Sequence, residues 1–435
     1  MLLKVDDWPV IGEYDVVVVG AGSAGIGAAV AASRAGCSTA VIEKYGFPGG
    51  VSTIAFCPFL MGFAYGDRQI VGGVADELVR ELDRLGQAAF VVDPAHIADN
   101  KPIGNRPILD NVITSVEGIR IAANNLFERA GVVRKYYTTL IGSIVEDNRV
   151  AAVAVDTVDG PGLIRGKAFV DATGDANLVW RSGGKVREYP VEESMTKSIL
   201  FRVGGVYNFN VKLIKERYNQ LVEAGEVPFP AQTRFMGIGM LNPGEVMLNF
   251  TLTAGNALSA DDLTRMDIEL RKQILVIVDW LRRYIPEFSQ CYLIDAGSGV
   301  GVRAGRGIVG HETITTDDLD NNIPVEEPVA LGHRSYGGHG INSFEPAWKK
   351  DNPGIRPIPW RALIPVSFEN VSVGGRAISC DVKVIDTVRL MARCMATGQA
   401  AGVSAALAVK EKKRIIDLAY SSVREILVEQ HAILA

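Results

Sequence analysis

The sequence is poor in cysteine, has no strong net charge and lacks a long apolar run. Its five cysteines among 435 residues are far apart and form no Cys-x-x-Cys pair, which disfavours a disulfide scaffold, an iron–sulfur cluster or a structural zinc. The formal net charge is only −5, so no nucleic-acid partner is expected. No stretch of about 18 apolar residues suggests a membrane span, and the acidic start at 1–9 does not resemble a signal peptide. We therefore expect a cytoplasmic protein with no membrane partner.

The most informative segment is residues 15–43. The apolar run Val16–Val19 predicts a buried strand, and the glycine-rich turn Gly20–Gly25 follows it directly. An alanine-rich helix comes next, then a second apolar strand at Thr39–Ile42 that ends at Glu43. A strand, glycine turn, helix, strand and acid in this order are the context that a dinucleotide-binding fingerprint requires.

Each part of this fingerprint has a physical task. Gly20 permits the tight turn, Gly22 lets the backbone approach a pyrophosphate, and Gly25 lets the helix pack close to the strand. The N-terminus of the helix offers free N–H groups and partial positive charge to phosphates. Glu43 is placed to accept hydrogen bonds from ribose hydroxyls, and its charge would repel a 2′-phosphate, which argues against NADP at this site.

The residue composition of the chain changes twice, near residues 184 and 365. Residues 1–184 and 366–435 carry nucleotide-fold patterns, whereas 185–365 hold most of the Met, His and Trp residues. We therefore predict an α/β fold with a Rossmann-like, three-layer nucleotide-binding domain that is discontinuous in sequence, and an inserted α+β substrate domain. The expected helices outside the fingerprint are 74–85, 115–130, 261–284 and 387–410, and short strands with turns are expected over 132–171.

Several further segments, taken together, resemble FAD-dependent oxidoreductases with a glutathione-reductase-type FAD domain. After the fingerprint, the matching segments are Gly49–Gly50, Ala172–Asp175, Gly301–Gly310, Arg356–Pro365, Val373–Ser379 and Arg389–Gly402.

The resemblance implies FAD in an extended pose. Its ADP half would lie on the glycine turn and Glu43, its pyrophosphate on the first helix with Arg376 nearby, and its flavin toward the helix that starts near Thr387. Arg389 would tune the reduced flavin. The cofactor-binding residues implied are Gly20, Gly22, Ser23, Ala24, Gly25, Glu43, Lys44, Gly49, Gly50, Ser52, Thr53, Leu140, Thr173, Gly174, Asp175, Gly375, Arg376, Val388 and Arg389.

Two glycines in the last segment, Gly398 and Gly402, are spaced like a small-residue helix face. We expect them to serve close helix packing rather than ligand binding.

Candidate catalytic groups come from the middle of the chain. The glycine-rich loop at 332–340 contains Tyr336 and His339, either of which can be a general base; the alternative is a surface loop with solvated histidines. Arg303 and Arg361 lie in segments that resemble substrate-side strands. Their guanidinium groups can clamp a carboxylate or phosphate, or pair with nearby acids. No third ligand accompanies His333 and His339 of this loop, so no metal site is predicted.

Two further patterns, at Cys57 and at 299–304, are weaker. Cys57 follows the Gly49–Gly50 turn, but Ser52 occupies the first of the two cysteine positions that disulfide reductases resembling glutathione reductase have in this segment. A redox disulfide is therefore ruled out, leaving a flavin-facing thiol or a buried packing cysteine. The segment 299–304 matches a second dinucleotide pattern, but the residues after it are too rich in glycine and β-branched residues for the required helix.

The sequence thus predicts an FAD-dependent oxidoreductase that transfers a hydride between a small organic substrate and flavin N5. An arginine clamp would select an anionic substrate, and a homo-oligomer is compatible with the sequence. Two alternatives stand beside this reading: a thiol- or peroxide-type reductase that uses Cys57, and an electron-transfer flavoprotein that serves a protein partner.

Overall fold

The computed structural model describes residues 8–90, 103–109, 111–229, 235–333 and 354–435. Its main sheet has the strand order β8-β2-β1-β11-β10-β9, with β20 also paired to β11. The strands are β1 (Val10–Val19), β2 (Thr39–Ile42), β8 (Val133–Lys135), β9 (Thr138–Glu146), β10 (Arg149–Thr157), β11 (Gly160–Asp171) and β20 (Val371–Val373).

Long strand β11 joins two kinds of sheet. Its first half pairs with β10 in antiparallel register, and its last residues, Phe169–Asp171, pair with β20 in parallel register. Strands β1, β2 and β8 continue the parallel part on the other side. The carboxyl ends of five parallel strands therefore meet at one edge, which is where open α/β sheets bind ligands.

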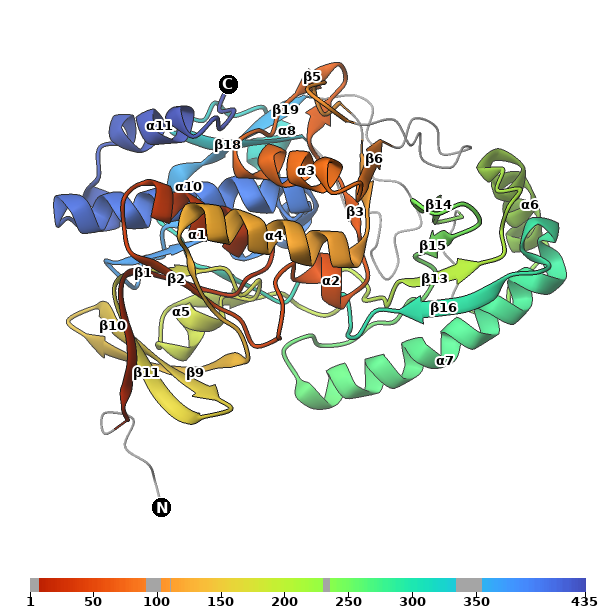
Figure 1. Cartoon of the computed structure of the whole chain (residues 1–435), viewed down its shortest axis with the longest axis horizontal. Helices are drawn as coiled ribbons and strands as arrows, with labels where there is room; N and C mark the ends of the chain where they lie inside the picture. The colour runs from red at the N-terminus through yellow and green to blue at the C-terminus, as the bar shows by residue number, and fades with distance from the viewer. Residues whose placement is uncertain (1–7, 91–102, 110, 230–234, 334–353) are drawn as a thin grey trace.

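Helices lie together on one side of the parallel strands (Figure 1), and α5 contacts β9 and β11 at the antiparallel end of the sheet. The α/β, Rossmann-like architecture predicted from the sequence is confirmed, and the C-terminal β20 and α10 join the N-terminal fingerprint unit across the chain. The helices that contact the sheet on this side are α1 (Ser23–Arg34), α4 (Val116–Ala130) and α10 (Met391–Glu411), and α3 (Val74–Arg84) packs on these helices.

The contact between α1 and α10 depends on glycine. A Cβ on Gly398 would lie 2.0 Å from the Ala24 carbonyl oxygen, and one on Gly402 would lie 2.2 Å from the Ala28 carbonyl oxygen. Because both neighbours are backbone atoms, no side-chain rotation can relieve the clash. The packing role expected for these two glycines is confirmed.

Replacing Gly402 with alanine is therefore expected to lower the free energy of unfolding by about 1–3 kcal/mol, the usual cost of overpacking a core. Denaturant unfolding of the purified protein measures it. Gly142→Ala is the matched control, because a Cβ there meets only the Ala154 Cβ at 3.7 Å. Equal unfolding midpoints for the two variants would contradict the close-packing account.

A second core lies in the lobe on the right of Figure 1. It draws its buried side chains from residues 199–291 and is rich in edge-to-face aromatic pairs, such as Tyr218 with Phe250. Residues from 304 to 364 contribute instead to the core of the main sheet. The domain boundaries at 184 and 365 stay predictions. The elements of this lobe are β13 (Phe201–Gly204), α6 (Val211–Glu223), β14 (Gly237–Gly239), β15 (Val246–Leu248), α7 (Ala260–Tyr284) and β16 (Tyr292–Ala296).

The remaining elements are short and connect or flank these two cores. They are α2 (Val51–Ile54), β3 (Phe59–Leu60), β4 (Ala64–Tyr65), β5 (Arg68–Gln69), β6 (Ala88–Phe90), β7 (Val112–Thr114), α5 (Asn177–Arg181), β12 (Val186–Glu188), η2 (Pro286–Phe288), β17 (Arg306–Ile308), α8 (Thr316–Asp320), β18 (Pro328–His333), β19 (Ile355–Pro359), η3 (Trp360–Leu363), η4 (Gly375–Ala377), η5 (Val382–Val384), α9 (Ile385–Val388), η6 (Ile415–Asp417) and α11 (Tyr420–Glu429).

One predicted helix was wrong at its start. The segment expected to run as one helix over 387–410 is divided into α9 and α10, because Leu390 adopts an extended backbone with ψ 142°. The long helix therefore begins at Met391, and Arg389 lies in the break before it.

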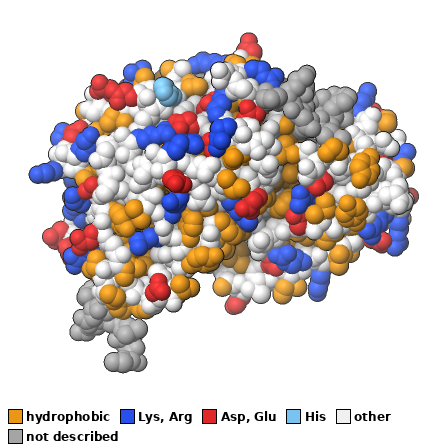
Figure 2. Space-filling model, in the orientation of Figure 1, with side chains coloured by type: hydrophobic (Ala, Val, Ile, Leu, Met, Phe, Trp, Pro, Cys, Tyr) orange, Lys and Arg blue, Asp and Glu red, His pale blue; other side chains and the backbone are white. Residues whose placement is uncertain are grey.

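The surface has no field of a single sign on the face that Figure 2 shows, where basic and acidic side chains are interspersed. Among the helices of the described ranges, none has the length and apolar character needed to cross a bilayer.

Candidate functional site

The fingerprint turn adopts the geometry that its glycines predict. Gly20 has φ +98°, and its N–H donates to the Ile42 carbonyl oxygen at 2.8 Å. A Cβ on Gly25 would lie 1.8 Å from the Gly20 carbonyl oxygen. Gly22 is the N-cap of α1 and supplies no side-chain cap, so the first N–H groups of the helix are left for a ligand such as a phosphate.

Glu43 lies beside this turn, at the end of β2. Its side chain is only 8% exposed, and its carboxylate accepts hydrogen bonds from the backbone N–H groups of Ala21 at 2.8 Å and Tyr45 at 3.1 Å. Burial raises the pKa of Glu43, and the two backbone donors oppose that rise. Each carboxylate oxygen can accept more than one hydrogen bond, so the group can still receive ribose hydroxyls.

The Gly49–Gly50 turn packs directly on the fingerprint. The Gly49 N–H donates to the Ala21 carbonyl oxygen at 2.9 Å, and a Cβ on Gly50 would lie 2.8 Å from the Gly22 Cα. Helix α2 follows and buries the side chains of Ser52 and Thr53. The structure thus brings this predicted segment against α1.

The loop after β11 is held by Asp171, a residue that the sequence analysis missed. Its buried carboxylate accepts hydrogen bonds from the N–H and hydroxyl of Thr173 and from the N–H groups of Leu178 and Val179. Four donors on one carboxylate fix the Thr173–Asp175 turn at the ligand-binding edge. An aspartate that ends a buried strand just before a glycine-containing turn is the signal that could have revealed it.

Asp175 and Arg376 join the loops that follow β11 and β20. Arg376 Nη2 lies 2.7 Å from Asp175 Oδ2. Asp175 Oδ1 and Arg376 Nε are buried and have no hydrogen-bond partner. Gly174 lies against this pair with φ +85°, and a Cβ there would be 3.1 Å from Arg376 Cζ. An acceptor and a donor are therefore both unsatisfied at this edge.

The break between α9 and α10 opens a second helix N-terminus. Val388 is fully buried, and Arg389 pairs with Asp386 at 2.5 Å. Leu390 gives α10 no side-chain cap, and the first turn of α10 contains no acidic residue. The positive end of a 21-residue helix is therefore available to a partner with negative charge. Nearby, the Gly375 N–H donates to Thr397 Oγ1 at 3.0 Å.

Three cations are buried near this region. Lys197 is 2% exposed, Arg303 9% and Arg393 0%. Arg393 donates through Nη1 to the Thr387 carbonyl oxygen, but its Nε and Nη2 have no hydrogen-bond partner. Sequence reasoning missed Lys197 and Arg393. Each is a charged residue in a largely uncharged run of buried residues, and that contrast is a usable signal.

Three other predicted residues, Arg361, Lys44 and Leu140, lie within the described ranges. Arg361 pairs with Glu327 at 2.8 Å and is largely exposed, so the structure shows it engaged with an acid. Lys44 is exposed and lies over the Tyr45 ring, and Leu140 lies in β9. His339 and Tyr336 lie outside the described residues.

The structure describes both of the weaker patterns, Cys57 and the segment 299–304. Burial raises the pKa of the Cys57 thiol, although Arg303 and Arg389 oppose the rise, so the thiol stays protonated at neutral pH. All five cysteines are described and free. The segment 299–304 leads into β17 (Arg306–Ile308) rather than a helix, as expected. Within the described ranges, no three His, Cys, Asp or Glu side chains form a metal-binding group.

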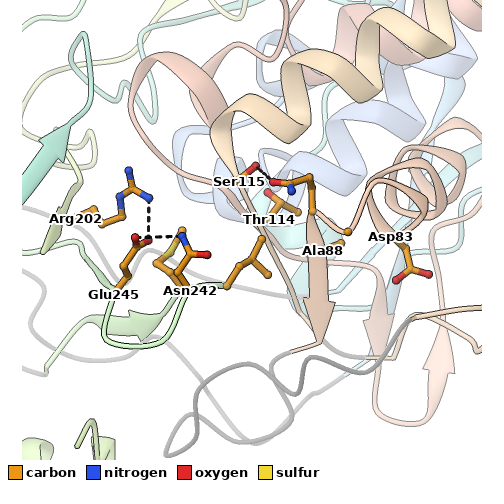
Figure 3. A pocket seen from close by; sticks show the side chains of 11 residues that line it. Asp83, Ala88, Thr114, Ser115, Arg202, Asn242 and Glu245 are labelled. Atoms are coloured by element: carbon orange, nitrogen blue, oxygen red, sulfur yellow. Dashed lines mark hydrogen bonds and ion pairs between the residues drawn. The ribbon is translucent and has the colours of Figure 1, made fainter. Parts of the chain in front are cut away.

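A separate cavity of about 300 Å³ lies between the main sheet's covering elements and the second lobe (Figure 3). Arg202 faces it and is paired with Glu245 at 2.8 Å and Asp295 at 2.7 Å. Asn242 also donates to Glu245, and Ser115 is bonded to Gln87. Its charged arginine is thus already satisfied by this protein's own acids.

The strand-end edge fits FAD. The uncapped α1 N-terminus suits the pyrophosphate, Glu43 suits the ribose, and the unsatisfied atoms of Asp175 and Arg376 offer an acceptor and a donor to a polar ligand. The uncapped α10 N-terminus suits the electron-rich edge of a flavin.

Comparisons with solved structures support this fold. A geranylgeranyl bacteriochlorophyll reductase-like protein from Thermoplasma acidophilum aligns with a TM-score of 0.51 and 14% identity over 97% of this chain and 84% of that one. The p-nitrophenol 4-monooxygenase of Pseudomonas putida aligns with a TM-score of 0.51 and 11% identity over 96% and 84%. At such identities the likeness shows a shared fold alone.

Sequence comparisons agree. Thiamine thiazole synthase from Saccharolobus islandicus is 29% identical over 209 residues, which cover 45% of this chain and 67% of that protein. The same enzyme from another strain is covered to 64%, so the chain spans about two thirds of the length of these curated relatives. The model of the FAD dependent oxidoreductase family matches residues 15–427. The chain therefore belongs to the FAD-dependent oxidoreductase family: it is an enzyme, and its cofactor is FAD.

Proposed function

We propose that this enzyme transfers a hydride between a small organic substrate and N5 of the flavin. The observation that carries the proposal is the pair of uncapped helix N-termini, α1 and α10, at the edge where the parallel strands end. When bound, FAD supplies the two-electron chemistry.

The residues of this chain have separable tasks in that reaction. The first turn of α1 holds the pyrophosphate, and Glu43 holds the ribose, so the cofactor is anchored at its ADP half. The N-terminus of α10 stabilises negative charge at the other end of the cofactor, and Arg389, held by Asp386, adds a positive charge beside it. This arrangement favours the two-electron reduced cofactor over the same cofactor in water.

The first experiment is to record the visible spectrum of the purified protein and then identify the cofactor after heat denaturation. The second is anaerobic mixing with hydroxy acids, polyols and amines. We expect released FAD, and bleaching of the flavin absorbance by at least one class of donor. A protein whose FAD is bleached by dithionite but by none of these donors would contradict substrate dehydrogenation and would favour the electron-transfer alternative.

A further inference from the structure

Positive charge is buried in excess next to the proposed cofactor site. Lys197, Arg303 and Arg393 are all at least nine-tenths buried, and within the described ranges none has a carboxylate oxygen within 4.0 Å. The neighbouring arginines differ, because Arg376 is paired with Asp175 and Arg389 with Asp386. Buried charge without a partner is costly, so this excess points to an anion that the described residues do not supply.

The geometry around Lys197 is fixed on both sides. Arg303 donates through Nη1 to the Thr196 carbonyl oxygen at 2.6 Å and through Nη2 to Ser198 Oγ at 2.9 Å. Lys197 itself exchanges both backbone hydrogen bonds with Thr253, at 2.8 and 3.1 Å. One guanidinium therefore holds the residues before and after the lysine, and a β-bridge to Thr253 holds the lysine backbone.

The ammonium of Lys197 has no hydrogen-bond partner among the described residues. Burial lowers its pKa to about 8; Arg303 and Arg376 add to that effect, while Asp175 and Asp262 oppose it. Neither acid lies within 4.0 Å of the Lys197 ammonium: Asp175 pairs through Oδ2 with Arg376, and Asp262 pairs with Arg265 at 3.0 Å. The local charges therefore leave Lys197 and Arg303 in need of an anionic partner.

We propose that Lys197 and Arg303 bind the carboxylate of an anionic substrate beside the flavin. This inference rests on the proposed function, and it narrows the substrate to small organic acids. The same chemistry could be satisfied by the diphosphate of FAD. A substrate carboxylate is favoured because the α1 N-terminus and Arg376 already suit the diphosphate, whereas Lys197 and Arg303 come from 185–365, the segment predicted as the substrate domain.

The test is a titration of the FAD-loaded enzyme with lactate, succinate and benzoate, followed by the visible absorbance of the flavin. The variants are Lys197→Met and Arg303→Met, and Lys212→Met on the exposed face of α6 is the matched control. We expect a saturable spectral change in wild type and in the control. We expect about a tenfold to 100-fold weaker response in the other two variants, as for loss of a charge-assisted hydrogen bond.

The pH dependence of carboxylate binding is a second readout, and it would not change if Lys197 served only in packing. Wild-type affinity for the carboxylate should fall as the pH rises above about 8, where Lys197 loses its proton, and Lys197→Met should lack this fall. Equal carboxylate affinity in wild type and both variants would overturn the inference.

A second titration separates the two sources of the anion. FAD is added to the apoproteins, and we expect wild type and Lys197→Met to bind it equally. If instead Lys197→Met weakens FAD binding and no carboxylate perturbs the wild-type flavin, the cations serve the cofactor and the inference is wrong. Failure of the proposed function looks different, because the bound FAD would then be inert toward every donor while carboxylates still perturb its spectrum.

Discussion

Replacing Glu43 with glutamine is expected to weaken FAD binding about tenfold to 100-fold. The buried carboxylate ends β2 beside the fingerprint turn, and hydrogen bonds to a charged group contribute about 1.5–3 kcal/mol, with about 1.4 kcal/mol for each tenfold change. Glutamine keeps the size but removes the charge. Titration of the apoprotein with FAD, followed by flavin fluorescence, measures the loss.

The pH dependence of FAD binding tests the same prediction in a second way. Because burial raises the pKa of Glu43, wild-type affinity for FAD should fall as the pH drops through that raised value, and Glu43→Gln should show no such fall. Glu13→Gln is the control, since Glu13 is exposed on β1. Equal FAD affinity for both variants would show that Glu43 does not hold the ribose. The unfolding midpoint of each apoprotein separates lost binding from misfolding.

Replacing Lys197 with methionine is expected to stabilise the apoprotein at pH 7 by on the order of 3 kcal/mol. The pKa of Lys197 falls from 10.5 to about 8 on folding, and each unit corresponds to about 1.36 kcal/mol. Methionine is unbranched and fills a similar space without a charge to desolvate. Denaturant unfolding of the apoproteins at several pH values measures the difference.

The sign of the pH effect follows from proton binding. Between about pH 8 and pH 10.5 the unfolded chain holds a proton on Lys197 that the folded chain has lost, so the wild-type free energy of unfolding rises with pH in this window. The advantage of Lys197→Met should therefore be full below pH 8 and vanish by about pH 10.5. Saturating carboxylate should also reduce the difference in unfolding free energy between Lys197→Met and wild type at pH 7, since a ligand that binds the folded wild type stabilises that state. Equal stability at pH 7 would show that Lys197 carries no desolvation cost.

The sequence by itself determined the cofactor fold. Gly20, Gly22 and Gly25 stand where the backbone must turn tightly or approach another group closely, whatever side chains surround them. A carboxylate directly after the second strand is typical of ribose binding. Long apolar runs likewise identify buried parallel strands without further context. These local constraints predicted β1, α1 and β2, because each element depends on residues that are close in sequence. They also predicted the packing role of Gly398 and Gly402, because that role depends only on the lack of a side chain.

Only the tertiary structure decided which charges face one another. Arg303 and Arg361 look alike in sequence, yet the first is buried against Thr196 and Ser198 while the second pairs with Glu327. Lys197 belongs to no motif, and its position follows from contacts with Thr253 and Arg303, which lie far from it in the chain. Electrostatic energy depends on distance and burial, neither of which a one-dimensional pattern contains, so the fold could be predicted from the sequence while the proposed anion site could not.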